Sequence, residues 1–266
     1  MKSLLILTDE QSEFLVSKAD PRGYTSMDIN KIANYFRERD YSVRILKFSE
    51  LDLREDYRGV YVVYQSSETP GGFYKRYIES IVYYLERKGA TVLPNTEYLK
   101  AHHDKVFMEL MRSRFSDDAL KTLESKPYGS WVDALGYNLG FPVVVKSASS
   151  SASAGVFLAR NKPEFDKAIR KAGRVIISDN LGDYLKGWLK TQVKRLIKVF
   201  DPAKEKYYWK YNTTPLSLPL IVQPFVEGLE GDFKVLYFGG KYFSMYRRNR
   251  ENDFRASGSG VFLQVP

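Results

Sequence analysis

Apolar and polar positions in the first hundred residues follow two periods, one typical of buried strands and one typical of amphipathic helices. Residues 3–8 (SLLILT) form a continuous apolar run, which predicts a strand that is buried on both faces. Residues 26–39 carry apolar side chains at near-helical spacing, with Ser26 as a candidate N-cap. Residues 73–88 form a second helical pattern that stops at Gly89.

Short apolar runs between these helical patterns predict three more strands. They lie at residues 43–46, 59–65 and 90–94. Because strands and helices alternate, residues 1–97 are predicted to form a small α/β domain with a parallel sheet. No GxGxxG sequence follows the first strand, so the dinucleotide-binding fingerprint is absent.

The pattern changes after residue 97. A long helix is predicted first, and a polar, turn-rich stretch follows it up to Gly140. The later elements are a strand–loop–strand unit at 141–161, a helix at 163–172, a short strand at 174–178, a strand at 218–228 and a β-hairpin at 231–249. The helix covers residues 97–115, and the hairpin is predicted to turn at Gly239-Gly240.

Composition narrows the chemistry that the chain can perform. The 266 residues include 44% hydrophobic and 27% charged residues, which is enough apolar material for a sizeable core. There is no Cys, which excludes disulfides, Cys-ligated metals and a Cys nucleophile. The only two His are adjacent, His102 and His103, so neither a multi-His metal site nor a Ser-His-Asp triad is expected. Enzymatic chemistry here would have to use carboxylates, Lys, Arg, backbone amides and a hard metal ion.

The sequence predicts neither a signal peptide nor a membrane-spanning segment. Acidic residues interrupt the N-terminal apolar run at Asp9, Glu10 and Glu13, so no signal peptide is predicted. No apolar stretch reaches 18 residues, so no membrane span is predicted either. The expected location is the cytoplasm.

The net charge of +9 suits an anionic ligand, and much of it lies in one segment. Residues 186–210 hold eight basic and two acidic residues, which gives +6 of the +9. Trp188, Val193 and Ile197 give this segment an apolar side. We favour an ordinary amphipathic helix with core on one side and solvent on the other. Recruitment of an acidic peptide, a polyanion or a membrane surface is the alternative.

Two stretches carry candidate ligand chemistry. In 141–161 a strand ends at Lys146 and a Ser/Ala/Gly loop follows, so backbone amides and an ammonium could hold an anion. In 220–260 an extended apolar strand is followed by alternating Asp, Lys and Arg, and guanidinium groups suit carboxylates and phosphates. Taken alone, each feature is explained as simply by a surface loop and solvated charges.

Three stretches, taken in order, resemble the ATP-grasp ligases. HDKVFMELM (103–111) is similar to the family's "DK" helix, and FPVVVKSASSSASAGVFLAR (141–160) to its "P-V-V-x-K-P…G…G-V" unit. The third stretch, IVQPFVEGLEGDFKVLYFGGKYFSMYRRNRENDFRASGSG (221–260), is similar to "V-Q-E-F-I…D-I-R-V…G-G…R…D-F-R-x-N…G-G". The resemblance is strongest to the branch that contains glutathione synthetase and the enzymes that add glutamate to protein C-termini.

The resemblance implies an ATP-grasp fold with four segments. They are an N-terminal α/β domain (1–97), a linker and helix (98–140), a lid subdomain (141–217) and the start of a C-terminal antiparallel sheet domain (218–266).

The resemblance also implies roles for particular residues. Lys105 and Lys146 would hold the ATP phosphates, and the loop with Ser149, Ser150, Ser151 and Gly155 would close over them. The adenine pocket would be lined by Gln223, Phe225 and Val226, with Glu230 or Asp232 near the ribose or the substrate. Catalytic roles would fall to Arg247 at the acyl phosphate and to Asp253 and Arg255 in the shared cleft.

The implied reaction uses ATP and Mg²⁺ to join a carboxylate substrate to an amine through an acyl phosphate. Departures from the family pattern are Ser147, Pro224 and Ser257, where Pro, Glu and Asn are usual. The family's magnesium ligands, an Asp and a Glu-x-Asn, are not seen before Pro266, so we expect a shortened catalytic part and assign no metal ligand.

Two other functions stay open. One is a nucleotide-binding or scaffolding module without catalysis, and the other is a polyanion or nucleic-acid binder that uses residues 186–210. Nucleic acid ranks last because no RNA-binding aromatic motif is present. The sequence leaves open whether the chain forms a homo-oligomer.

Overall fold

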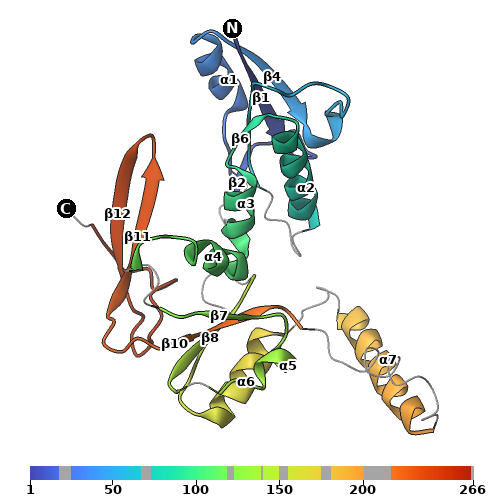
Figure 1. Cartoon of the computed structure of the whole chain (residues 1–266), viewed down its shortest axis with the longest axis vertical. Coiled ribbons are helices and arrows are strands. Elements are labelled where there is room, and N and C mark those ends of the chain that lie inside the picture. Colours follow the sequence, from blue (N-terminus) through green and yellow to red (C-terminus); the bar gives the residue numbers. More distant parts are fainter. Residues whose placement is uncertain are drawn as a thin grey trace. The chain divides into compact units, whose positions relative to one another are not determined.

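The computed structural model describes residues 1–17, 25–66, 73–118, 123–138, 140–149, 155–174, 181–200 and 217–264. The chain divides into two compact units, Met1–His103 and Asp104–Pro266. The first holds a parallel sheet and the second holds two antiparallel sheets (Figure 1). The predicted α/β class, with a parallel sheet first and antiparallel sheets after it, is therefore confirmed. The boundaries of the four implied segments stay a prediction.

The sheet of the first unit has the strand order β4-β1-β5-β6. The central strand β1 (Lys2–Thr8) pairs in parallel with β4 (Tyr41–Lys47) and β5 (Val60–Tyr64), and β5 pairs with β6 (Thr91–Leu93). All four strands correspond to predicted ones. The short strands β2 (Leu15–Ser17) and β3 (Thr25–Ser26) were not predicted.

Residues that alternate along β1 belong to two separate cores. Leu4 and Ile6 share a buried cluster with Ala33 of α1, whereas Leu5 and Leu7 belong to the larger cluster that contains α2. A strand that is covered on both faces needs apolar side chains at successive positions. This explains why its sequence is a continuous apolar run.

The helices of the first unit begin and end at recognisable residues. Helix α1 (Ile29–Arg37) begins after Asp28, whose carboxylate accepts from the amide of Lys31 at 3.0 Å. The predicted N-cap, Ser26, was wrong, because its hydroxyl instead accepts from a loop amide outside the helix. Helix α2 (Phe73–Arg87) was predicted correctly.

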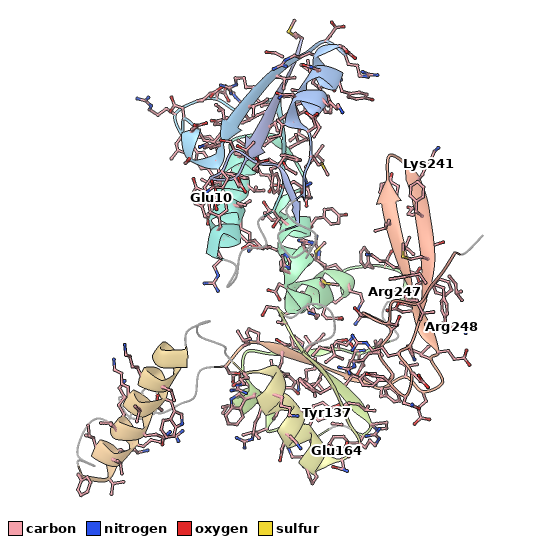
Figure 2. All side chains as sticks on the ribbon, turned by 180° about the vertical axis from the view of Figure 1, so that it is seen from behind. Glu10, Tyr137, Glu164, Lys241, Arg247 and Arg248 are labelled. Atoms are coloured by element: carbon pink, nitrogen blue, oxygen red, sulfur yellow. The ribbon has the colours of Figure 1, made fainter. Side chains whose placement is uncertain are left out.

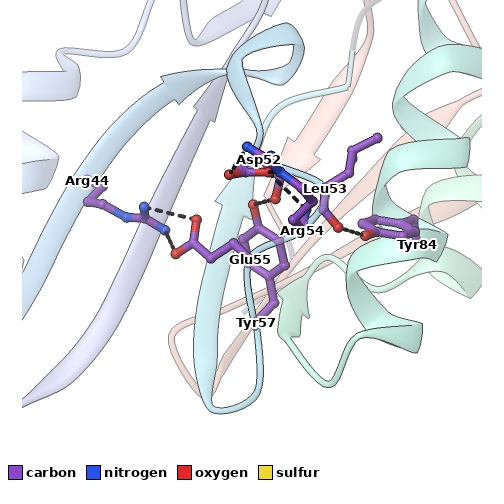
Figure 3. Close-up of polar contacts among 7 residues, drawn as sticks. All are labelled: Arg44, Asp52, Leu53, Arg54, Glu55, Tyr57 and Tyr84. Atoms are coloured by element: carbon purple, nitrogen blue, oxygen red, sulfur yellow. Dashed lines mark hydrogen bonds and ion pairs between the residues drawn. The ribbon is translucent and has the colours of Figure 1, made fainter.

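Gly89 follows α2 with a φ of +88°, a left-handed conformation that favours glycine and ends helices. The helix α2 also anchors the loop that follows the short 3₁₀ helix Phe48–Glu50. The hydroxyl of Tyr84 donates to the carbonyl of Leu53, and the hydroxyl of buried Tyr57 donates to the carbonyl of Asp52 at 3.0 Å (Figure 3). Two tyrosine hydroxyls thus satisfy loop carbonyls that no strand pairs.

The predicted helix over 97–115 is instead two helices. Helix α3 (Thr96–His103) ends the first unit, and helix α4 (Lys105–Arg112) begins the second. Asp104 lies between them as the N-cap of α4, with an extended backbone. Leu99 and Val106 are seven residues apart, which is about two helical turns, so apolar spacing alone does not separate the two helices.

The larger sheet of the second unit has the order β7-β10-β8-β9, and all its pairs are antiparallel. Its strands are β7 (Lys126–Tyr128), β10 (Leu220–Pro224), β8 (Val143–Ser147) and β9 (Val156–Ala159). β7 and the short helix α5 (Trp131–Ala134) lie in the stretch that we predicted to be turn-rich.

Helix α6 (Lys162–Ala172) covers one face of this sheet. Its buried Phe165 and Ile169 pack with Val145 of β8 and Val222 of β10. The short strand predicted at 174–178 is seen only at Arg174, which bridges to Ser217, and the rest lies outside the described residues.

The second sheet of this unit contains β11 (Gly231–Phe238), β12 (Lys241–Arg248) and β13 (Phe262–Gln264). The predicted hairpin is confirmed. Its turn residues Gly239 and Gly240 have φ values of +57° and +78°. Positive φ at both central positions is the pattern of the type I′ turn that matches strand twist.

Helix α7 (Leu181–Phe200) contains Trp188, Val193 and Ile197, the apolar side chains named above for the basic segment. Trp188, Leu189 and Val193 are 52%, 53% and 51% exposed, so our interpretation of a core on one side was wrong. The rest of the basic segment, from residue 201 to 210, lies outside the described residues. In the described part of the chain, no helix combines the length and hydropathy needed to cross a membrane.

Candidate functional site

A cavity of about 460 Å³ lies within the second unit. Ligand-binding cavities in proteins usually measure about 300–1,000 Å³, so this one could hold a small molecule. Its lining residues are Lys105, Leu123, Val144, Lys146, Val156, Gln223, Pro224, Phe225, Val226, Leu229, Gly231, Asp232, Asn249, Phe254, Arg255, Ala256 and Ser257.

Strand register selects the residues that the larger sheet contributes. Val144 of β8 lies opposite Gln223 of β10, and Val156 of β9 lies opposite Lys146. Directly opposed residues share a face, and neighbours along a strand alternate between faces. These four residues therefore lie on the face opposite the one that α6 covers.

Lys105 reaches the cavity because α4 begins beside the end of β8. Its backbone amide donates to the carbonyl of Ala148 at 3.1 Å, and its Nζ lies 3.4 Å from the same oxygen. The carboxylate of Asp104 accepts from the amides of Val106 and Phe107 at 2.9 and 3.2 Å. This N-cap fixes the first turn of α4, and with it the backbone of Lys105.

Both lysines of the cavity are partly buried, and burial disfavours their charged form. Burial lowers the pKa of Lys146, although the charge of Glu109 acts in the opposite direction. Burial also lowers the pKa of Lys105, and the positive charge of Lys146 lowers it further. A bound anion would relieve both effects, so this end of the cavity suits a ligand of high negative charge.

The other part of the cavity is apolar and aromatic. The rings of Phe225 and Phe254 meet edge to face, with centroids 5.8 Å apart and an interplanar angle of 86°. Val226, Leu229 and Leu123 complete this part of the lining. Such a surface suits a flat heteroaromatic ring.

Asp232 lines the cavity and is held by Arg247. Two parallel bonds of 2.7 Å join Nε and Nη2 of Arg247 to the two carboxylate oxygens. The two residues are register partners on β11 and β12. Figure 2 shows Arg247 on the hairpin next to Arg248. Arg247 itself does not line the cavity, so its contact with the site passes through Asp232.

Asp253 and Arg255 form a second paired set. Arg255 lines the cavity, whereas Asp253 lines a neighbouring cavity of about 600 Å³ that shares Phe225 and Phe254. Hydrogen bonds from Arg255 lower the pKa of Asp253, and the same contact raises the pKa of Arg255. The pair therefore stays charged over the physiological pH range.

The cavity brings together half of the residues that the sequence nominated. Those that line it are Lys105, Lys146, Gln223, Phe225, Val226, Asp232 and Arg255. Those that are described but do not line it are Ser149, Gly155, Glu230, Arg247 and Asp253. Ser150 and Ser151 lie outside the described residues. The roles assigned to all of them stay predictions.

Sequence reasoning missed several lining residues. Phe254 stands between Asp253 and Arg255 in the quoted motif, and its ring could have been nominated from that position. Leu229 and Asn249 flank the hairpin at its open end, where Asn249 donates to the carbonyls of Leu229 and Glu230. No sequence signal separates these two from ordinary turn residues.

The described residues do not fit a magnesium ion. Asp232 provides the only carboxylate in the described cavity lining, and both of its oxygens accept from Arg247. Within the described ranges, no group of three or more His, Asp or Glu residues could hold a metal. The described lining therefore supplies no ligand set for a metal ion.

No protein-family model matches this sequence, and no curated protein matches it either. Several solved structures are similar. D-cycloserine synthetase DcsG is 11% identical over 92% of this chain and 68% of its own, with a TM-score of 0.44. D-alanyl-alanine synthetase A from Vibrio cholerae is 13% identical over 94% of this chain and 69% of its own, with a TM-score of 0.41.

A further similar structure is the RimK domain ATP-grasp protein from Sphaerobacter thermophilus. It is 12% identical over 94% of this chain and 87% of its own, with a TM-score of 0.40. All three identities are low, between 11% and 13%.

The N-cap of α4 yields a testable expectation. Asp104→Ala should lower the free energy of unfolding by about 0.5–2 kcal/mol, because two helix amides lose their acceptor. Asp104→Asn should retain most of the stability, because Asn caps as well as Asp. Urea denaturation followed by circular dichroism measures both. Equal losses in the two variants would show that the charge of Asp104, and not its cap, matters.

Proposed function

We propose that this cavity binds ATP and that the chain is the nucleotide-binding part of an ATP-dependent ligase that joins a carboxylate to an amine. The observation that supports the proposal is that the lining of the cavity combines a cationic part with an apolar part. Two partly buried lysines lie in its lining together with an aromatic and aliphatic part. A nucleoside triphosphate has the same division, with a flat apolar base and a polyanionic tail.

The end of β10 supplies backbone groups for the base. The amide of Phe225 donates to the carbonyl of Pro142 on the β8 side, and backbone groups alternate sides along an extended chain. The carbonyl of Pro224 and the amide of Val226 therefore point to the other side, where β7 pairs only as far as Val222. A carbonyl acceptor and an amide donor two residues apart match the amino group and ring nitrogen of adenine.

The lysines act on the phosphate end. Lys105 and Lys146 are point charges that neutralise phosphate oxygens, and partial burial strengthens that attraction. Asp232 is held in place by Arg247, and its carboxylate oxygens can accept hydrogen bonds from ribose hydroxyls. Each of these contacts positions the nucleotide without a covalent step.

Ligase chemistry would follow from this positioning. A substrate carboxylate attacks the γ-phosphate, ADP leaves, and an amine displaces phosphate from the acyl phosphate. Lys105, Lys146 and Arg255 would stabilise the negative charge that is shared between attacking and leaving oxygens. The resemblance to ATP-grasp ligases supports this reaction, and the chain's lack of Cys agrees with it.

A second candidate is nucleotide binding without catalysis. It is favoured by one observation, that the described cavity lining offers no carboxylate that is free of an arginine partner. Phosphoryl transfer normally requires a metal ion between the phosphates.

Turnover distinguishes the two candidates. Phosphate release from ATP would be measured with mixtures of carboxylic acids and amines, in the presence and absence of Mg²⁺. Release that needs both an acid and an amine supports the ligase. Tight ATP binding without release under any mixture supports the non-catalytic module.

Removal of one lysine tests the site itself. Lys146→Ala should weaken ATP binding about 10- to 100-fold, since a hydrogen bond to a charged group contributes about 1.5–3 kcal/mol. Lys167→Ala, on the exposed side of α6, is the matched control and should bind as the parent does. Isothermal titration calorimetry measures all three proteins. Equal affinity of Lys146→Ala and the parent would contradict the placement of the phosphates.

The lowered lysine pKa values predict a pH dependence. An anion binds the charged lysines, so affinity is complete below their pKa and is lost as the pH rises through it. Because both pKa values lie below the ordinary 10.5, ATP affinity should fall before the pH reaches 10.5. ATP itself is fully ionised in this range, because the last phosphate pKa is about 6.

Calorimetric titration at increasing pH measures the loss. In Lys146→Arg the fall should be shallower, because a guanidinium stays protonated. An affinity that stays constant up to pH 10.5 would contradict the involvement of the lysines.

A further inference from the structure

Helix α7 has two chemically distinct faces along its length. At about 100° per residue, Leu185, Leu189 and Leu196 fall at the centre of one face. Lys190 and Lys194 fall on the opposite face, and they continue a stripe of lysines that recurs every fourth residue. The full stripe is Lys186, Lys190, Lys194 and Lys198.

The apolar face of α7 is exposed. The large apolar residues of the helix that are more than 40% exposed are Leu185, Trp188, Leu189, Val193, Leu196, Ile197, Val199 and Phe200. Single exposed apolar residues are normal on a soluble protein, but a contiguous set marks a surface that contacts something else. Trp188 lies at one border of this face, and the aromatic ring of tryptophan favours the boundary between water and an apolar phase.

Charge accompanies this apolar face. The 20 residues of α7 contain five basic residues and one acidic residue, which gives a net +4 of the chain's +9. Lys186 and Arg195 lie near the two borders of the apolar face. Their long stems can follow an apolar surface while the charged ends reach an anionic layer above it.

We propose that α7 is a peripheral membrane helix that lies flat on an anionic lipid surface. Its apolar face would enter the boundary between headgroups and acyl chains, and its lysines would meet the negative surface potential. The inference concerns a different element from the cavity, and vesicle binding can be measured without nucleotide.

Other occupants match fewer of these features. A second copy would bring another +9 chain and another lysine stripe, which repel. A nucleic acid would engage the lysines but leave the apolar face in water. A protein groove would cover the apolar face, but it gains little from the lysines on the far side. An anionic membrane also attracts the lysines on the far side of the helix. Its electrostatic field extends about 10 Å from the lipid surface, and a helix is about that wide.

Flotation of the full chain with lipid vesicles tests the proposal. Vesicles of phosphatidylcholine alone are compared with vesicles that also contain phosphatidylserine, and binding is expected only to the second kind. Lys190→Gln/Lys194→Gln should weaken binding about 30-fold, because each lysine near such a surface contributes about a factor of five. Leu189→Gln/Leu196→Gln should weaken it about 100-fold through loss of apolar burial.

The control is Lys31→Gln/Lys167→Gln, which removes the same charge from exposed positions on α1 and α6 and should bind as the parent does. Circular dichroism checks that each variant is folded. If the leucine double variant does not fold, the lysine double variant still tests the proposal. Three outcomes overturn the proposal. They are no dependence on phosphatidylserine, binding that both α7 pairs leave unchanged, and retention on polyglutamate or RNA without vesicle binding.

Discussion

The pairing of β8 with β10 is the constraint on which the candidate site depends. These strands lie more than seventy residues apart in the chain, and their register places Lys146 and Gln223 on one face of the sheet. A slip of β10 by one residue against β8 would turn Gln223 into the core and bring Val222 out. The cluster that Val145 and Val222 form with α6 therefore holds the site in register as well as stabilising the sheet.

The acidic and basic side chains at the cavity differ in how their charges are compensated. Asp232 is matched by Arg247, and Asp253 by Arg255, so each of these two carboxylates is neutralised by a guanidinium group. At the two lysines burial instead disfavours the charged form, and at Lys105 the positive charge of Lys146 disfavours it further. A bound polyanion would stabilise the charged form of both lysines, which burial disfavours in the folded chain. Stability and ligand binding are thus linked through the same two side chains.

The two proposed functions, nucleotide binding and lipid binding, depend on different kinds of interaction. Nucleotide binding depends on a few directed contacts in a shaped cavity, where a displacement of the α4 cap or of β10 matters. Lipid binding by α7 would depend on exposed apolar area and summed charge, and it tolerates changes in position along the helix. A chain that carries both could hold a soluble nucleotide while it rests on a surface.

Much of the local structure could be predicted because it depends on local periodicity and turn chemistry. The strands of the parallel sheet, helix α2 ending at Gly89 and the hairpin turning at Gly239-Gly240 all follow from patterns within about fifteen residues. For these elements neighbouring residues alone contain the required information. Both lysines of the cavity were nominated differently, through the resemblance to the ATP-grasp motifs.

What only the tertiary structure decided involves residues that are distant in sequence. Periodicity predicted one helix over residues 97–115, but the chain breaks at Asp104, where the amide of Lys105 donates to the distant carbonyl of Ala148. Periodicity also showed the apolar side of α7, but not that the side is exposed. Arg247 could be nominated from its motif, whereas its place behind Asp232 follows from strand pairing. A pattern records which side of an element is apolar, and only the folded chain decides what that side meets.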